Sequence, residues 1–236
     1  IKEGVEAIIA DFNNDSQNDI IIGSGGADFS NQTKPLLDNY FVQNDTIFKS
    51  EEFPEFYENA SVIISNDFDN DNDQDLFIGS NSVSFDFGNI PSSYILENNN
   101  GKFSMVKNEA LQKTGMITDA IWDDFNNDGQ IDLIVVGEWM APKFFKNNDG
   151  IFTEENVMES KLKGLWRQIE PFDIDNDGDT DYLLGNWGTN SKFKASQNHP
   201  LRMYYGDFDD NGRTETIICS YKNGAYYPLL GLDELA

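Results

Sequence analysis

The stretch Asp124-Phe-Asn-Asn-Asp-Gly-Gln-Ile-Asp-Leu-Ile-Val-Val-Gly137 joins a nine-residue loop rich in acids and amides to an apolar, strand-like run. Oxygen-bearing side chains stand at loop positions 1, 3, 5 and 9, and Ca²⁺ is a hard cation that prefers oxygen ligands. Position 7 would contribute its backbone carbonyl, so its side chain is free to vary. Gly129 at position 6 suits a sharp turn because it has no Cβ. The stretch therefore predicts a calcium loop between two strands.

The same loop occurs five times, beginning at residues 11, 67, 124, 173 and 207. A single copy could be an ordinary solvated Asp/Asn turn, but five copies in one register favour metal sites. An EF-hand does not fit, because position 12 is apolar in every copy instead of Glu. Up to five Ca²⁺ ions are therefore expected. The predicted ligands are Asp11, Asn13, Asp15, Gln17 and Asp19; Asp67, Asp69, Asp71, Asp73 and Asp75; Asp124, Asn126, Asp128, Gln130 and Asp132; Asp173, Asp175, Asp177, Asp179 and Asp181; and Asp207, Asp209, Asn211, Arg213 and Glu215.

The residue at position 6 also ranks the five loops. Gly178 and Gly212 suit a left-handed turn, Asn72 tolerates it, and Ser16 fits it less well. The fourth loop combines five Asp residues with Gly178. We therefore expect the fourth loop to bind calcium most strongly and the first to be among the weakest.

The spacing of the loops predicts a repeat architecture. Successive loops start 56, 57, 49 and 34 residues apart, and periods of this size are typical of propellers and solenoids. A strand-like run enters and leaves each loop, and Asn-Gly and Asp-Gly turns at residues 100–101 and 149–150 indicate a further hairpin. Four short antiparallel strands per unit are typical of a propeller blade. The predicted fold is all-β: a single β-propeller domain over residues 1–236, with approximate units 1–56, 57–113, 114–163, 164–200 and 201–236.

The last two units look incomplete. Residues 186–200 show no clear hairpin, and in the fifth unit residues 225–230 are the only candidate for a third strand. The pattern indicates about three full blades and two partial ones. We interpret the chain as part of a larger protein and as an arc of a larger propeller; a closed five-unit ring is the less favoured alternative.

Charge and composition exclude several classes of partner. The net charge is −26, and nearly half of the acidic residues stand at predicted ligand positions. Such acidity argues against nucleic acid and anionic membranes as partners, and no apolar run is long enough to insert directly into a bilayer. With one cysteine, Cys219, and one histidine, His199, the chain holds neither an internal disulfide nor a zinc site.

Several of these motifs resemble a known family. The run 124–137 resembles FG-GAP/VCBS-type repeats, which occur in integrin α-subunit propellers and in many bacterial surface proteins. The run 144–152 is similar to a hairpin of bacterial proteins with ASPIC/UnbV-type modules, and runs 137–142 and 185–196 resemble a large Bacteroidetes VCBS protein type. The resemblance implies a calcium-binding propeller with roles ranging from adhesion to carbohydrate handling. The integrin-type Gly-Ala-Pro after the second strand is not kept, which weakens any integrin-like ligand mechanism.

Blade topology predicts where a partner would bind. Loops between the first two strands lie on one face of a propeller, and the insertions 24–35, 80–92, 138–141 and 186–200 belong to the other face. Binding residues concentrate on such supported loops, and Trp beside acids and amides suits sugars or peptides, although packing as structural plugs is the alternative for Trp139 and Trp187. The predicted ligand-binding residues are Glu138, Trp139, Trp187 and Phe193, with Phe29, Phe85 and Phe87 as further candidates.

These features favour a calcium-stabilised binding or adhesion scaffold that recognises a glycan or protein. Extracellular calcium modules bind too weakly to fill at cytosolic calcium levels, so we expect an extracellular, cell-surface or periplasmic location. No serine-hydrolase elbow, zinc-protease motif or phosphate loop is present in the sequence. The chain is therefore not expected to be an enzyme, and no catalytic residue is assigned. The alternatives are part of a polysaccharide-processing, lyase-like enzyme and a purely structural spacer of a large surface protein.

Overall fold

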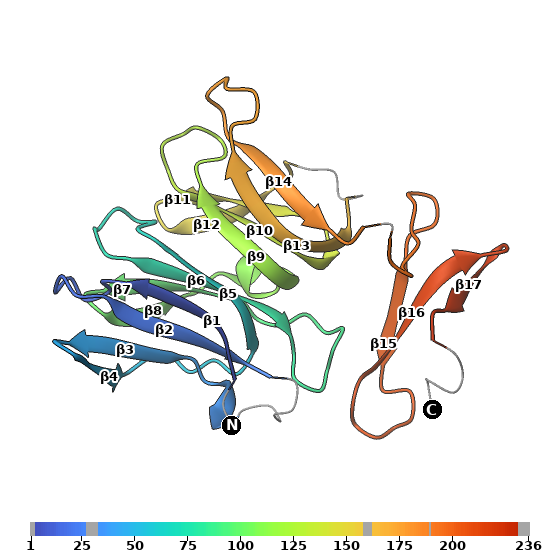
Figure 1. The fold of residues 1–236 in the computed structure, drawn as a ribbon, viewed down its shortest axis with the longest axis horizontal. Helices are drawn as coiled ribbons and strands as arrows, with labels where there is room; N and C mark the ends of the chain where they lie inside the picture. The colour runs from blue at the N-terminus through green and yellow to red at the C-terminus, as the bar shows by residue number, and fades with distance from the viewer. Residues whose placement is uncertain (1–2, 27–32, 158–161, 189, 231–236) are drawn as a thin grey trace.

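The computed structural model describes residues 3–26, 33–157, 162–188 and 190–230. Almost all of its regular structure is β-strand, and the only helical turns in these ranges are η1 (Lys34–Leu36) and α1 (Glu109–Gln112). The strands form a succession of antiparallel sheets, which Figure 1 shows from blue to red. The predicted all-β fold, with blade-like four-stranded sheets, is therefore confirmed. Among the described residues, no helix is long and apolar enough to cross a lipid bilayer.

The first three sheets each contain four consecutive strands, and the Asp-rich loop joins the first strand to the second in each. The first sheet contains β1 (Glu3–Ala10), β2 (Asp19–Gly25), β3 (Asn39–Asn44) and β4 (Ile47–Glu51). The second contains β5 (Asn59–Asn66), β6 (Asp75–Ser82), β7 (Tyr94–Asn99) and β8 (Lys102–Val106). The third contains β9 (Met116–Asp123), β10 (Asp132–Met140), β11 (Lys143–Asn148) and β12 (Ile151–Glu155).

The last two sheets are smaller, as the sequence predicted. The fourth consists of β13 (Gly164–Phe172) and β14 (Asp181–Asn186), and no further strand follows before β15 in the described residues. The fifth contains β15 (Arg202–Gly206), β16 (Glu215–Lys222) and β17 (Ala225–Pro228). The predicted third strand of the fifth unit is thus present.

Hairpin turns close the outer edge of these sheets. Both central residues of three turns have positive φ, as type I′ turns require, and Gly or Asn/Asp supplies this conformation at little steric cost. The pairs are Asn100–Gly101, Asp149–Gly150 and Asn223–Gly224. The hairpin signals in the sequence therefore correspond to real turns.

The first strands of consecutive sheets lie side by side: β5 lies between β1 and β9, and β13 lies beside β9. Three apolar clusters fill the spaces between neighbouring sheets. The aromatic residue at loop position 2 belongs to these clusters, since Phe12 and Phe68 are buried. Phe12 packs edge-on against Phe103 of the next sheet, and Phe68 stacks on Trp122. Burial of one such ring contributes about 1.5–3 kcal/mol, so the first and second Asp loops are anchored to the neighbouring blade. Position 2 of the fourth and fifth loops is exposed instead, at Ile174 and Phe208.

The third and fourth sheets are joined by hydrogen bonds, which the sequence did not predict. Glu138 pairs with Leu165 and Met140 with Gly164, with an irregularity between the two pairs. Trp139 sits at this bulge with a φ of 62°. The prediction that residues 138–141 form an inserted loop was wrong, because β10 extends to Met140.

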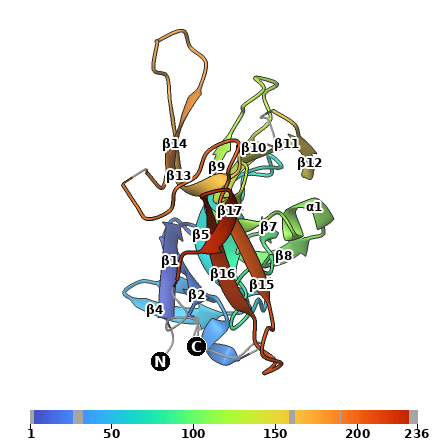
Figure 2. The same cartoon turned by 90° about the vertical axis from the view of Figure 1, so that its right-hand side faces the viewer.

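The fifth sheet is placed differently from the others. The backbone N–H of Thr214, in its Asp loop, donates to the carbonyl of Phe85 at 3.4 Å, and the Thr214 hydroxyl bonds Asp86. A Cβ on Gly88 would come within 2.7 Å of the Tyr205 ring. The fifth loop therefore contacts the β6–β7 connection, on the opposite side from the other Asp loops, and Figures 1 and 2 show it at the far end from the β13–β14 loop. The expectation that all five loops share one face was wrong for the fifth.

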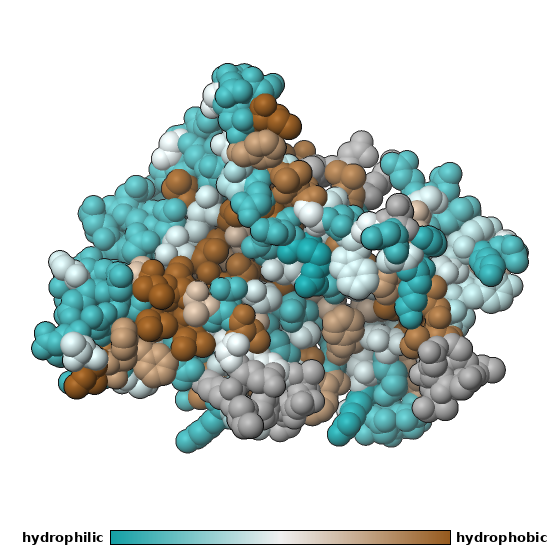
Figure 3. All heavy atoms as spheres, viewed as in Figure 1, coloured by the Kyte–Doolittle hydropathy of each residue, from teal (hydrophilic) through white to brown (hydrophobic). Residues whose placement is uncertain are grey.

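Some apolar side chains remain exposed on the outermost sheets. Ile9 of β1 is 64% exposed and Leu183 of β14 is 61% exposed. In Figure 3 hydrophobic atoms gather over β1. These are blade faces that carry apolar residues without a neighbouring sheet in the described part of the chain.

Candidate metal centres

Each Asp loop has the same backbone course, with positive φ at positions 4 and 6. At position 6, Ser16 and Asn72 adopt φ of 68° and 73°, and the other three loops have glycine there. The conformation predicted for position 6 is therefore confirmed, including at the less suitable Ser16. Position 4 also lies in the left-handed region, in Asn14, Asn70, Asn127, Asn176 and Asp210. In the sequence, position 4 is Asn or Asp in all five loops, and these residues tolerate this conformation best after glycine.

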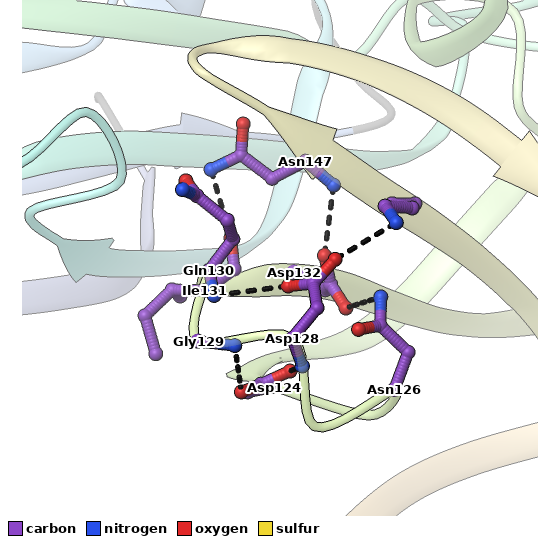
Figure 4. A network of polar contacts seen from close by, with 9 residues as sticks. Asp124, Asn126, Asp128, Gly129, Gln130, Ile131, Asp132 and Asn147 are labelled. Atoms are coloured by element: carbon purple, nitrogen blue, oxygen red, sulfur yellow. Dashed lines mark hydrogen bonds and ion pairs between the residues drawn. The ribbon is translucent and has the colours of Figure 1, made fainter.

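The carboxylate at position 1 is held in place by the loop's own backbone. In the third loop, the N–H of Asp128 donates to Asp124 Oδ1 at 3.0 Å and the N–H of Gly129 donates to Asp124 Oδ2 at 2.7 Å (Figure 4). Asp11, Asp67 and Asp207 accept the equivalent pair of bonds in their loops. This arrangement turns the loop around the first carboxylate and brings positions 3 and 5 near it.

Three loops bring carboxylates together closely enough to hold one metal ion. One oxygen from each of Asp67, Asp69 and Asp71 lies within 4.8 Å of the others in the second loop. The fourth and fifth loops also form such groups, but from positions 1, 3 and 9. The residues are Asp173, Asp175 and Asp181 in the fourth loop, and Asp207, Asp209 and Glu215 in the fifth. Like charges at this separation repel each other, and a bound cation would remove that repulsion.

Position 9 has a structural role in the first three loops. Asp19, Asp75 and Asp132 are fully buried at the start of the second strand. Asp75 Oδ2 accepts the N–H of Phe68 at 3.1 Å, and Asp75 Oδ1 accepts the N–H of Asn98 on β7 at 2.9 Å. These oxygens already bind backbone donors, so a metal ion would have to share them.

Burial makes two of these carboxylates poor acids. It raises the pKa of Asp75 to about 7, although the N–H groups of Asn98 and Phe68 oppose the shift. It likewise raises the pKa of Asp132 to about 6, against the N–H of Asn147. A bound divalent cation would favour the ionised forms, since an opposite charge nearby lowers a carboxyl pKa.

A buried asparagine connects the third loop to its neighbours, and another does so for the second loop; the sequence reasoning missed both. The Asn147 N–H donates to Asp132 Oδ1 at 2.8 Å (Figure 4). Its Nδ2 donates to the Ile131 carbonyl at 3.0 Å and to the Phe68 carbonyl, in the preceding blade's loop, at 2.7 Å. Its Oδ1 accepts the N–H of Gly150 in the hairpin turn at 2.8 Å. One side chain thus joins two loops and a turn.

Asn98 makes the same set of bonds one blade earlier. Its Nδ2 reaches the carbonyls of Phe12 and Gln74, and its Oδ1 accepts the N–H of Gly101. The available signal was the Asn-x-x-Gly pattern of residues 98–101 and 147–150. In the sequence alone that pattern predicts a turn. Only the fold shows that the asparagine side chain is buried and joins two loops.

The third loop shows that its donor set fits a cation. Asn126 Oδ1 and Gln130 Oε1 are buried and have no hydrogen-bond donor among the described residues. A buried carbonyl oxygen without a donor is costly, and amide oxygens are normal calcium ligands. Asn126 stands at a predicted ligand position, with Asp124 and Asp128 on either side of it in the loop. Lys146 already brings one positive charge here, since its Nζ lies 2.8 Å from Asp128 Oδ2.

In the first, second and fifth loops the side chain at position 7 contacts other partners, in agreement with a ligand role limited to the backbone. Gln130, at position 7 of the third loop, points away from Asp124 in Figure 4. Gln17 Oε1 accepts the N–H of Asp45 at 2.9 Å, and Asp73 Oδ2 accepts the N–H of Asn100 at 2.7 Å. The Arg213 guanidinium lies 5.0 Å from the centre of the Phe85 ring. The ligand role of these backbone carbonyls itself stays a prediction.

The predicted ligand-binding residues form two pairs beside the start of β13. Glu138 lies on β10 next to Trp139, and its Oε1 is 2.5 Å from Arg167 Nη1. Trp187 is 46% exposed, and its ring centre lies 5.0 Å from that of Phe193. Leu165 connects the pairs, since it lies opposite Glu138 and its carbonyl accepts the Trp187 N–H. The other candidates lie elsewhere: Phe85 and Phe87 are exposed in the β6–β7 connection, and Phe29 lies outside the described residues.

Comparison with known proteins agrees with this repeated geometry. A family model described as FG-GAP-like repeat matches residues 67–135 and again residues 124–184. The two matches overlap at the third Asp loop and together extend over half of the chain. A search of the curated proteins found no match. The chain belongs to the FG-GAP-like repeat family.

Proposed function

We propose that this chain is a calcium-stabilised extracellular scaffold that recognises a glycan or a protein. The observation that carries the calcium part is the third loop, where Asn126 Oδ1 is buried without a donor at a predicted ligand position between Asp124 and Asp128 in the loop. Five loops share this backbone course, so up to five ions would bind. Calcium would hold each loop rigid and, through Asn98 and Asn147, hold adjacent blades together.

Thermal unfolding tests the calcium role. Calcium at 100 times its dissociation constant would add about 2.7 kcal/mol of stability for each site that binds only the native state. Millimolar Ca²⁺ should therefore raise the melting temperature well above that measured in EGTA. The same concentration of Mg²⁺ should raise it less, because Mg²⁺ demands a smaller octahedral site. Identical melting curves in EGTA and in Ca²⁺ would refute the proposal.

Recognition is proposed on the side where β10 and β14 end and β13 begins, because exposed aromatic rings there stand beside polar groups. Trp187 and Phe193 form an exposed aromatic pair, and Glu138 and Arg167 supply charged groups across β13. A glycan array probed with the wild type and with Trp139→Ala and Trp187→Ala would test this. Tyr227→Ala is a matched control, since Tyr227 is an exposed aromatic residue on the fifth sheet. Unchanged binding in both tryptophan variants would remove them from the site.

The expected location of the protein follows from the affinity of its calcium loops. Weak calcium loops would fill at extracellular calcium levels and not in the cytosol, so we place the protein outside the cell, at its surface or in the periplasm. The hairpin of β11 and β12 supports the closer likeness to VCBS-type surface proteins with ASPIC/UnbV-like hairpins.

A spacer role in a larger surface protein and a lyase-like activity are the alternatives to the proposed function. Screening acidic polysaccharides for unsaturated products would detect the latter.

A further inference from the structure

A polar pocket lies between the first strands of four consecutive sheets. Its volume is about 420 Å³, which is within the range of small-molecule sites. Four lining residues are equivalent, because each stands six positions before an Asp loop: Val5, Ser61, Thr118 and Arg167. The pocket therefore follows from the repeat, and its chemistry depends on what each blade places at this position.

The hydroxyl groups at this position serve the fold. Ser61 Oγ donates to the carbonyl of Ile117 on β9 at 2.7 Å. Thr118 Oγ1 donates to the carbonyl of Trp166 on β13 at 2.9 Å. Both bonds link one blade to the next, and both oxygens keep lone pairs that can accept a ligand hydroxyl.

Arg167 departs from this pattern. Its side chain is 54% exposed, and Glu138 Oε1 lies 2.5 Å from its Nη1. A guanidinium has five N–H donors in a rigid fork, so most of its donors remain available. The fold does not require an arginine here, since the equivalent residues are a valine, a serine and a threonine.

The rest of the lining is neutral and rich in hydrogen-bonding groups. Asn59 is 5% exposed; its Nδ2 donates to Ser82 Oγ at 3.1 Å, and its Oδ1 has no donor in the described part of the chain. A hydroxyl group entering beside it would satisfy that oxygen. Asn81 and the backbone of Gly25 and Gly26 complete the polar wall. Among the described residues, none that lines the pocket is acidic, although the chain carries 42 acidic residues.

From this lining we propose that the pocket binds a hydroxylated carboxylate, the chemistry of a uronic-acid sugar residue. The carboxylate would take the free donors of Arg167 in a charge-assisted pair, and the ligand hydroxyls would reach Asn59, Ser61 and Thr118. Glu138 competes for the same guanidinium and so weakens the site. This inference deepens the recognition role proposed above, and it does not depend on which calcium loops are filled.

Titration calorimetry in saturating calcium tests the proposal with three probes: glucuronate, glucose and acetate. Glucuronate should bind about tenfold or more tightly than either of the others, because only it offers both a carboxylate and hydroxyls. Arg167→Gln should weaken glucuronate binding about tenfold, whereas Glu138→Gln should strengthen it by removing the competing carboxylate. Arg202→Gln should leave binding unchanged, since Arg202 lies over Tyr226 in the fifth sheet.

Arg167→Gln should weaken glucuronate binding, whereas Glu138→Gln should strengthen it. Because a folding defect would weaken binding in both variants, it would not produce this pair of results. Equal binding of glucuronate and acetate would overturn the sugar assignment, and equal binding of glucuronate and glucose would overturn the role of Arg167. Absence of glucuronate binding in a protein that calcium still stabilises would refute this pocket and leave the calcium scaffold intact. Absence of any calcium effect would refute the scaffold proposal separately.

Discussion

Lys146 Nζ lies 2.8 Å from Asp128 Oδ2, so a lysine from β11 sits against the third Asp loop. The strand register gives the equivalent residue as Glu97 in the second sheet and Val42 in the first. Burial, then the carboxylates of Asp71, Asp67 and Glu97, raise the pKa of Asp69. One position on the third strand thus gives otherwise similar loops a positive, a negative or a neutral neighbour.

Replacing Lys146 with Gln should tighten calcium binding at the third loop by a few-fold. The ammonium group neutralises Asp128 and repels an incoming cation, and Gln keeps a polar side chain that is one bond shorter and uncharged. Calcium titration of the wild type and the variant measures the effect. Lys143→Gln is the control, because its Nζ pairs with Glu154, 3.1 Å away on β12, instead of with a loop residue. Equal effects of the two substitutions would show that only net charge matters.

Asp75→Asn should destabilise the metal-free protein by about 1–3 kcal/mol, because it leaves a buried backbone donor without its acceptor. Both Asp75 oxygens accept backbone N–H groups, and an amide replaces one of them with NH₂. Asp71→Asn is the matched control in the same loop, since Asn211 occupies that position in the fifth loop and accepts the equivalent N–H. Urea unfolding in EGTA measures both. A smaller loss for Asp75→Asn than for Asp71→Asn would contradict this assignment.

Asn127→Val should cost roughly 1–2 kcal/mol, because a β-branched residue resists the left-handed conformation. Asn127 has a φ of 57° at position 4 of its loop. Asn127→Gly should cost much less, since glycine adopts this conformation readily. Thermal unfolding of the two variants separates backbone conformation from loss of the side chain. Equal losses would assign the effect to the asparagine amide.

The stability contribution of Asp119 should depend on pH. Burial is the main cause that raises the pKa of Asp119, and the N–H groups of Ile169 and Ala120 oppose it. The unfolded carboxyl titrates near pH 3.9, so the native state holds its proton to higher pH. By linkage, this group contributes most to stability below about pH 3.9 and progressively less as pH rises through its native pKa.

Asp119→Asn isolates that contribution, because the variant does not titrate at this position. The free energy of unfolding of the wild type minus that of Asp119→Asn should fall as pH rises from about 4 and then level off. Urea unfolding across pH in metal-free buffer measures the difference. A difference that rises with pH would mean that the ionised carboxylate is the form stabilised by Ile169 and Ala120.

The local elements were predictable from the sequence because they depend on residues close together in the chain. Position 6 of every loop bends as expected, and the Asn-Gly and Asp-Gly turns form hairpins. The buried roles of Asn98 and Asn147 were not predictable, because their partners Phe12 and Phe68 come from the preceding blade. The bulge at Trp139 likewise arises from pairing of β10 with β13, residues that are distant in the sequence.

The sequence by itself determined the repeat, the strand order within each blade and the residues that surround each candidate metal site. These follow from short-range periodicity, turn chemistry and the position of carboxylates along the chain. Only the tertiary structure decided which loops share a face, since the fifth loop packs against Phe85. It alone also brought Val5, Ser61, Thr118 and Arg167 around one pocket. The physical reason is that packing between blades joins residues tens of positions apart, and no local pattern encodes that separation.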